Sequence, residues 1–162
     1  MVPISRPAES MDPKGALRTL RIIHFAMCGS VFVYGLVAYL MIEYGTLPEG
    51  GFASDFPNIH VLRTVIYLLA AGCYVTIRIF KARFLTPDAL QGRAVSAQYI
   101  NTWYIIIFGL AEAIAIYGFL LFMIAALLDD FLVLAGISLL IFYWLRPKED
   151  EYHTLLRQPQ RV

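Results

Sequence analysis

The stretch YINTWYIIIFGLAEAIAIYGFLLFMIAAL, residues 99–127, decides the fold class, because Glu112 is its only charged residue. A helix that crosses the hydrocarbon core of a bilayer needs about 20 mainly apolar residues, each adding about 1.5 Å of length. Residues 99–127 exceed that length. We therefore expect this stretch to form a membrane-spanning helix.

Three further apolar runs lie at residues 17–42, 60–81 and 130–145. The chain has 162 residues, of which 59% are hydrophobic and only 15% are charged. A soluble domain of this size does not need so apolar a composition. We predict an all-α fold, an integral membrane four-helix protein built from two antiparallel helical hairpins.

The polar ends of the chain frame this helical region. We predict that residues 1–16, which three prolines interrupt, form a disordered cytoplasmic lead. Residues 17–146 form the predicted four-helix transmembrane domain, and residues 147–162 a cytoplasmic tail.

The charges between the helices predict the orientation of the chain. The loop at residues 43–58 has acidic residues but no Lys or Arg. Basic residues lie before the first helix, between the second and third, and after the fourth: Lys14, Arg18, Arg21, Arg78, Lys81, Arg83, Arg93, Arg146, Lys148, Arg157 and Arg161. Cytoplasmic loops are enriched in Lys and Arg. Both termini are therefore expected in the cytoplasm (N-in/C-in), and we expect the membrane to be a prokaryotic inner (plasma) membrane.

Several function classes have no support in the sequence. No nucleophile and base grouping, nucleotide-binding loop or metal-ligand spacing is present, so we expect neither an enzyme nor a bound cofactor or metal. The two cysteines, Cys28 and Cys73, lie inside apolar runs and are interpreted as small hydrophobic residues. The charge pattern indicates no nucleic-acid partner.

Glu112 is the candidate functional residue, because it lies near the middle of the third apolar run. A charged side chain at the bilayer centre costs about 2.5–3.5 kcal/mol on insertion scales. The carboxyl group is expected either to bind a proton or cation, or to meet a polar partner on another helix. Ser30, Tyr34 and Ser138 are the candidate partners, and both interpretations of Glu112 stay open.

The segment AEAIAIYG, residues 111–118, resembles the outer helix of the proteolipid c subunit of rotary ATP synthases. In that family a polar cytoplasmic loop leads into an apolar helix with a mid-membrane glutamate and a Tyr-Gly pair after it. The resemblance covers residues 89–125, about a quarter of the chain. It implies that Glu112 carries a proton or sodium ion and that Tyr117 supplies a supporting hydroxyl.

The leading functional hypothesis is therefore a small membrane subunit, oligomeric or part of a larger membrane complex, in which Glu112 binds or passes a proton or sodium ion. The alternative is a purely structural or accessory subunit of a larger complex. A quinone- or haem-anchoring subunit is a third hypothesis. It is weakened by His24 and His60, which are expected near opposite sides of the membrane. The expected partners are the lipid bilayer, and further copies of the chain or other membrane subunits.

Overall fold

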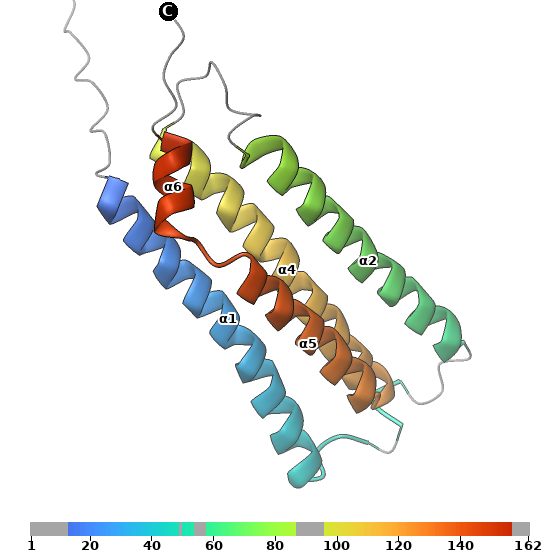
Figure 1. Ribbon diagram of the computed structural model, residues 1–162. Coiled ribbons are helices and arrows are strands. Elements are labelled where there is room, and N and C mark those ends of the chain that lie inside the picture. The colour runs from blue at the N-terminus through green and yellow to red at the C-terminus, as the bar shows by residue number, and fades with distance from the viewer. Residues whose placement is uncertain (1–12, 49, 54–57, 87–95, 157–162) are drawn as a thin grey trace, which may run out of the picture.

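The computed structural model describes residues 13–48, 50–53, 58–86 and 96–156, and these contain helices and no strand. The five helices are α1 (Pro13–Glu43), α2 (Ile59–Phe84), α4 (Ala97–Ala125), α5 (Leu128–Trp144) and α6 (Glu149–Leu156). Figure 1 shows α1 and α4 running in one direction and α2 and α5 running back. The predicted all-α fold is confirmed for the described residues.

Three of the helices, α1, α2 and α4, are long and apolar enough to cross a membrane. The shorter α5 has 17 residues and meets that test only together with α6, from which it is separated by a bend of 59°. An α-helix of 17 residues is about 25 Å long, which is the lower limit for crossing the hydrocarbon core. The apolar runs of the sequence therefore correspond to three long helices and one short one.

The helix ends differ from the predicted ranges by a few residues. Helix α1 begins at Pro13, inside the predicted lead, because proline suits the first turn of a helix. Helix α4 begins after Ser96, whose hydroxyl oxygen accepts a hydrogen bond from the Tyr99 N–H at 3.2 Å. The turn between α4 and α5 is at residues 126–127, where Ala126 has φ +54°, so Asp130 lies inside α5.

Helix α4 is the centre of the bundle, because it packs against α1, α2 and α5. Helices α1 and α2 lie on different sides of α4 and have little contact with each other (Figure 1). The first two helices, predicted as a hairpin, are consecutive and antiparallel but do not form a packed pair. Hydropathy does not specify neighbours, since in lipid the small and polar residues of a helix decide which helix it packs against.

Helices α4 and α5 approach closely at Gly118. A Cβ atom at this position would lie 2.9 Å from the Leu134 Cβ atom and 3.1 Å from the Phe131 Cα atom. About two turns earlier on α4, the Ala111 carbonyl accepts a hydrogen bond from the fully buried Ser138 hydroxyl at 2.7 Å. A small residue and an interhelical hydrogen bond thus hold this pair together.

The loop after α1 covers the end of α4. The last carbonyl groups of a helix lack partners within the helix. Here the Phe52 N–H donates to the Met123 carbonyl and the Ala53 N–H to the Ile124 carbonyl, both at 3.0 Å. Gly51, with φ +86°, permits this approach, because a Cβ atom there would collide with the backbone of Ile124.

The C-terminal helix α6 folds back onto the other end of the bundle. Its Tyr152 and Leu155 side chains are buried, and burial raises the pKa of Tyr152 above its ordinary value. The Tyr152 hydroxyl donates to the Asn101 Oδ1 atom at 3.0 Å, and the Asn101 amide nitrogen donates to the Ala16 carbonyl at 3.1 Å. Residues 149–156 of the predicted tail are therefore a packed helix.

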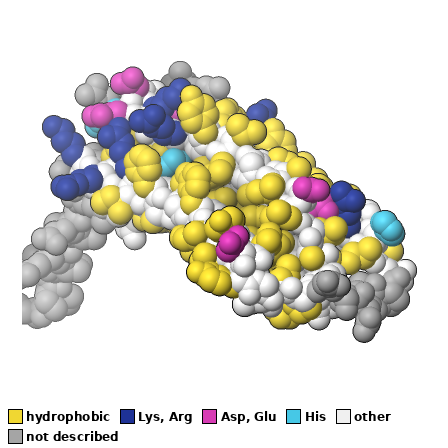
Figure 2. Space-filling model, turned by 90° about the horizontal axis from the view of Figure 1, so that it is seen from below, with side chains coloured by type: hydrophobic (Ala, Val, Ile, Leu, Met, Phe, Trp, Pro, Cys, Tyr) yellow, Lys and Arg dark blue, Asp and Glu magenta, His cyan; other side chains and the backbone are white. Residues whose placement is uncertain are grey.

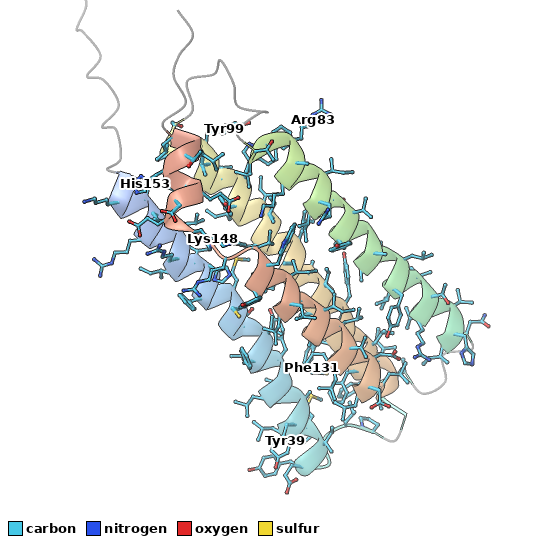
Figure 3. All side chains as sticks on the ribbon, viewed as in Figure 1. Tyr39, Arg83, Tyr99, Phe131, Lys148 and His153 are labelled. Atoms are coloured by element: carbon cyan, nitrogen blue, oxygen red, sulfur yellow. The ribbon has the colours of Figure 1, made fainter. Side chains whose placement is uncertain are left out.

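Charged side chains are concentrated at the two ends of the molecule. Figure 2 shows Lys and Arg side chains gathered toward one end of the face in view, a smaller charged group toward the other end, and hydrophobic side chains over the middle. Arg83, Tyr99 and His153 lie at the same end as α6, whereas Tyr39 lies at the opposite end (Figure 3). This distribution suits a bundle whose middle lies in hydrocarbon.

Replacing Gly118 with alanine is expected to destabilise the detergent-solubilised protein by about 1–3 kcal/mol, because the added methyl group forces α4 and α5 apart. Thermal unfolding followed by circular dichroism measures the change. The matched control is Gly109→Ala on the same helix, where a Cβ atom meets no atom within 4 Å. Equal losses in the two variants would contradict the close contact at Gly118.

Candidate functional site

Glu112 lies near the middle of α4, on the side that packs against α1. The neighbouring Ala111 and Ala115 are fully buried, whereas the Glu112 residue is half-buried. Small residues beside the carboxyl group let the helices approach without leaving a void.

Two hydroxyl groups of α1 bind one oxygen of the Glu112 carboxyl group. The Ser30 Oγ atom lies 2.5 Å from Glu112 Oε1, and the Tyr34 hydroxyl oxygen lies 2.9 Å from the same atom. Ser30 and Tyr34 are four residues apart, so they lie on one face of α1. The Tyr34 ring stacks on Phe119 of α4 with a centroid distance of 5.7 Å, which fixes the direction of its hydroxyl group.

The single hydrogen of the Ser30 hydroxyl has two possible acceptors. Besides Glu112 Oε1, the Met27 carbonyl oxygen lies 2.7 Å from Ser30 Oγ. The second carboxyl oxygen, Glu112 Oε2, accepts no hydrogen bond from any residue in the described ranges. Within the described ranges, the carboxyl group therefore has one oxygen held by two donors and one oxygen without a donor.

The other two predicted site residues lie elsewhere. The Ser138 hydroxyl donates to the Ala111 carbonyl and not to Glu112. Tyr117 lies beside Cys73 of α2. Five residues turn an α-helix by about 500°, so Tyr117 and Glu112 point in directions about 140° apart. The structure thus brings Ser30 and Tyr34 to Glu112, and places Tyr117 at the interface between α4 and α2.

A second carboxyl group, Asp130, forms a polar cluster that the sequence analysis did not identify. Asp130 is 3% exposed, and its Oδ1 atom accepts hydrogen bonds from Arg63 Nη2 at 2.8 Å and from the Tyr67 hydroxyl at 2.6 Å. The signal was present in the sequence, because Arg63 and Tyr67 are four residues apart on one face of α2.

Glu112 differs from Asp130 in its charge balance. The Asp130 carboxylate is paired with a guanidinium group. No Lys or Arg within the described part of the chain forms an ion pair with Glu112. An ionised carboxylate in a membrane is costly without a counter-cation, and in this respect the surroundings of Glu112 differ from those of Asp130.

The histidines do not meet at a common site. The Nε2 atom of buried His24 lies 3.0 Å from the Phe142 carbonyl oxygen. A carbonyl oxygen only accepts, so Nε2 carries the hydrogen and caps one of the last carbonyl groups of α5. His60 is in the first turn of α2, near the opposite end of the bundle. Among the described residues no three His, Cys, Asp or Glu side chains are grouped as a metal site requires.

Comparison with known proteins leaves the site to be interpreted from its own geometry. No protein-family model, no curated protein and no solved structure matches this chain.

Proposed function

We propose that this chain is a small integral membrane protein in which Glu112 reversibly binds a proton, and that it works as a self-associating unit or as a subunit of a larger membrane complex. The observation that carries this proposal is the Glu112 carboxyl group between α1 and α4. It has two hydroxyl donors on Oε1, none on Oε2 and no basic partner among the described residues.

The proposed topology has four spans with both termini in the cytoplasm. Arg21, Arg78, Lys81 and Arg146 lie toward the end of the bundle where α1 begins and α6 packs, which supports a cytoplasmic location for that end. Helix α5 is the fourth span, and Glu112 then lies near the bilayer midplane. A prokaryotic inner membrane is the proposed location.

A proton fits the contacts of Glu112 better than a sodium ion does. The Ser30 and Tyr34 oxygens lie at hydrogen-bonding distance from Glu112 Oε1. A metal cation between these atoms would have to replace both hydrogen bonds by ion–oxygen contacts and separate the oxygens. A proton on Oε2 neutralises the carboxylate and does not require the Ser30 and Tyr34 oxygens to move away from Oε1.

The Ser30 hydroxyl supplies a way for the site to adapt to its charge. With Glu112 ionised, the Ser30 hydrogen points to Oε1, because a charged acceptor makes the stronger hydrogen bond. With Oε2 protonated, the attraction of Oε1 weakens and the Met27 carbonyl becomes a competitive acceptor. Proton binding thus favours transfer of the Ser30 hydrogen bond from Glu112 Oε1 to the Met27 carbonyl, which already lies within hydrogen-bonding distance.

The resemblance of residues 111–118 to proteolipid c subunits supports the same role for Glu112, but Tyr117 has no part in it here. The structural alternative uses the same hydrogen bonds as a tie between α1 and α4. The two functions differ in whether Glu112 changes its protonation state, which the carboxyl chemistry below measures.

The topology predicts which exposed positions react from outside the cell. In a Cys28→Ala, Cys73→Ala background, Thr46→Cys in the loop after α1 is expected to react with a membrane-impermeant maleimide in intact cells. The matched Thr154→Cys variant on α6 is expected to react only after the membrane is permeabilised. Both threonines are exposed, so accessibility within the fold does not distinguish them. The reverse labelling pattern would contradict the N-in/C-in topology.

A hydrophobic carbodiimide is expected to label Glu112 in the membrane-embedded protein, because this reagent attacks protonated carboxyl groups in apolar surroundings. Labelling, mapped by mass spectrometry, should fall as the pH rises and vanish in Glu112→Gln. Asp130→Asn is the control and should leave it unchanged, because Asp130 is paired with Arg63. Labelling that does not depend on pH would refute proton exchange. Protection of Glu112 by added sodium would indicate that the site binds a sodium ion and not a proton.

Removing either hydroxyl donor is expected to change the carbodiimide labelling of Glu112, because Ser30→Ala and Tyr34→Phe each remove a hydrogen bond to Glu112 Oε1. Hydrogen bonds to a charged group contribute about 1.5–3 kcal/mol, so each loss should be measurable by the same mass-spectrometric assay. Ser138→Ala is the matched control, since its hydroxyl binds the Ala111 carbonyl. If all three variants change the labelling equally, Ser30 and Tyr34 have no specific role.

A further inference from the structure

A groove of about 320 Å³ lies between α2 and α5. The groove is lined by Tyr74 and Arg78 of α2 and by Ile137, Leu140, Ile141 and Trp144 of α5. The groove is thus mainly apolar, and the guanidinium group of Arg78 lies beside Trp144 at the end of α5.

The groove exists because α2 and α5 are joined at their ends and not along their lengths. At one end, Arg63 and Tyr67 bind Asp130. At the other end, the Trp144 ring lies under two cations, with Arg78 Cζ 5.1 Å and Lys81 Nζ 4.4 Å from its centroid. Between these ends the two helices have little direct contact, because both pack on α4.

The cations at Trp144 are only partly neutralised. Lys81 pairs with Glu151 of α6 at 3.8 Å. Arg78 contacts the Trp144 ring and pairs with no carboxylate in the described ranges. Two like charges on one aromatic ring with a single carboxylate leave an excess positive charge at the rim of an apolar groove. A guanidinium group in this position is suited to bind a phosphate through two parallel hydrogen bonds.

We propose that the groove binds one anionic phospholipid, with an acyl chain against Leu140 and Ile141 and the phosphate on Arg78. The α5 side of the groove runs from Ile137 to Trp144, a length of about 10 Å, which is suited to a segment of an extended acyl chain. Arg78 and Trp144 lie near the proposed cytoplasmic interface, where headgroups and aromatic belts are found. The site rests on the membrane location of the chain but not on Glu112.

Trp144 provides a direct probe of this groove. The chain has two tryptophans, so Trp103→Phe leaves Trp144 as the only one. In phosphatidylcholine vesicles, phosphatidylglycerol with brominated acyl chains is expected to quench Trp144 fluorescence with about fivefold higher apparent affinity than brominated phosphatidylcholine at the same fraction. Equal quenching by the two lipids would overturn the proposal.

Matched variants test whether Arg78 is the cause of the preference. Arg78→Gln is expected to bring the ratio of the two affinities close to one, whereas Arg83→Gln, which removes an exposed charge from the last turn of the same helix, should preserve it. An equal effect of both variants would reduce the site to general attraction by surface charge.

Two further measurements need no substitution at Arg78. Raising the sodium chloride concentration should reduce the preference for phosphatidylglycerol, because salt screens the contact at the rim. Inorganic phosphate at the same concentration as the lipid should not relieve the quenching, since it has no acyl chain to fill the groove. A preference insensitive to salt, or relief of quenching by phosphate, would contradict a phospholipid site.

Discussion

The need of helix α4 for hydrogen-bond partners in a place without water governs the arrangement of this protein. Lipid offers neither donors nor acceptors, so a polar atom inside the bundle must find its partner on another segment of the chain. The Glu112 carboxyl group meets Ser30 and Tyr34 of α1, and the Ala111 carbonyl meets Ser138 of α5. The end of α4 is capped by backbone N–H groups of the loop after α1. These contacts explain why α4 is central and why α1 packs on it and not on α2.

The two acidic clusters of the bundle show how one residue type serves different purposes. Asp130 is buried beside Arg63 and Tyr67, so its charge is balanced and its position is fixed near one end of the bundle. Among the described residues, only the hydroxyl groups of Ser30 and Tyr34 bind the Glu112 carboxyl group. A site that exchanges a proton needs this lack of fixed positive charge, whereas a tie between helices is stronger with it. The groove between α2 and α5 has the opposite charge imbalance, because the Arg78 guanidinium group has no anionic partner among the described residues.

Apolar run length predicted the long helices, because crossing a bilayer imposes a minimum number of apolar residues. The same reasoning singled out Glu112 and offered Ser30 and Tyr34 among its partners, since a carboxyl group inside the membrane is expected to meet a polar group on another helix. It did not predict that α1 and α2 would be separated by α4, because hydropathy does not say which faces meet. Tyr117 was grouped with Glu112 on the strength of a resemblance, although the angle between them points Tyr117 to α2. Residues 149–156 were predicted as part of a cytoplasmic tail. Tyr152 and Leu155 share one helical face, and their burial shows that this part of the tail packs against the bundle as helix α6.

The side-chain amide of Asn101 ties together three segments that are far apart in the sequence. It accepts a hydrogen bond from Tyr152 of α6 and donates one to the backbone of Ala16 at the start of α1. Any force that pulls α6 from the bundle therefore also loosens the base of α1, the helix whose later turns carry the hydroxyl groups at Glu112. The seating of the C-terminal helix and the attachment of the first turn of α1 to α4 thus depend on a single side chain.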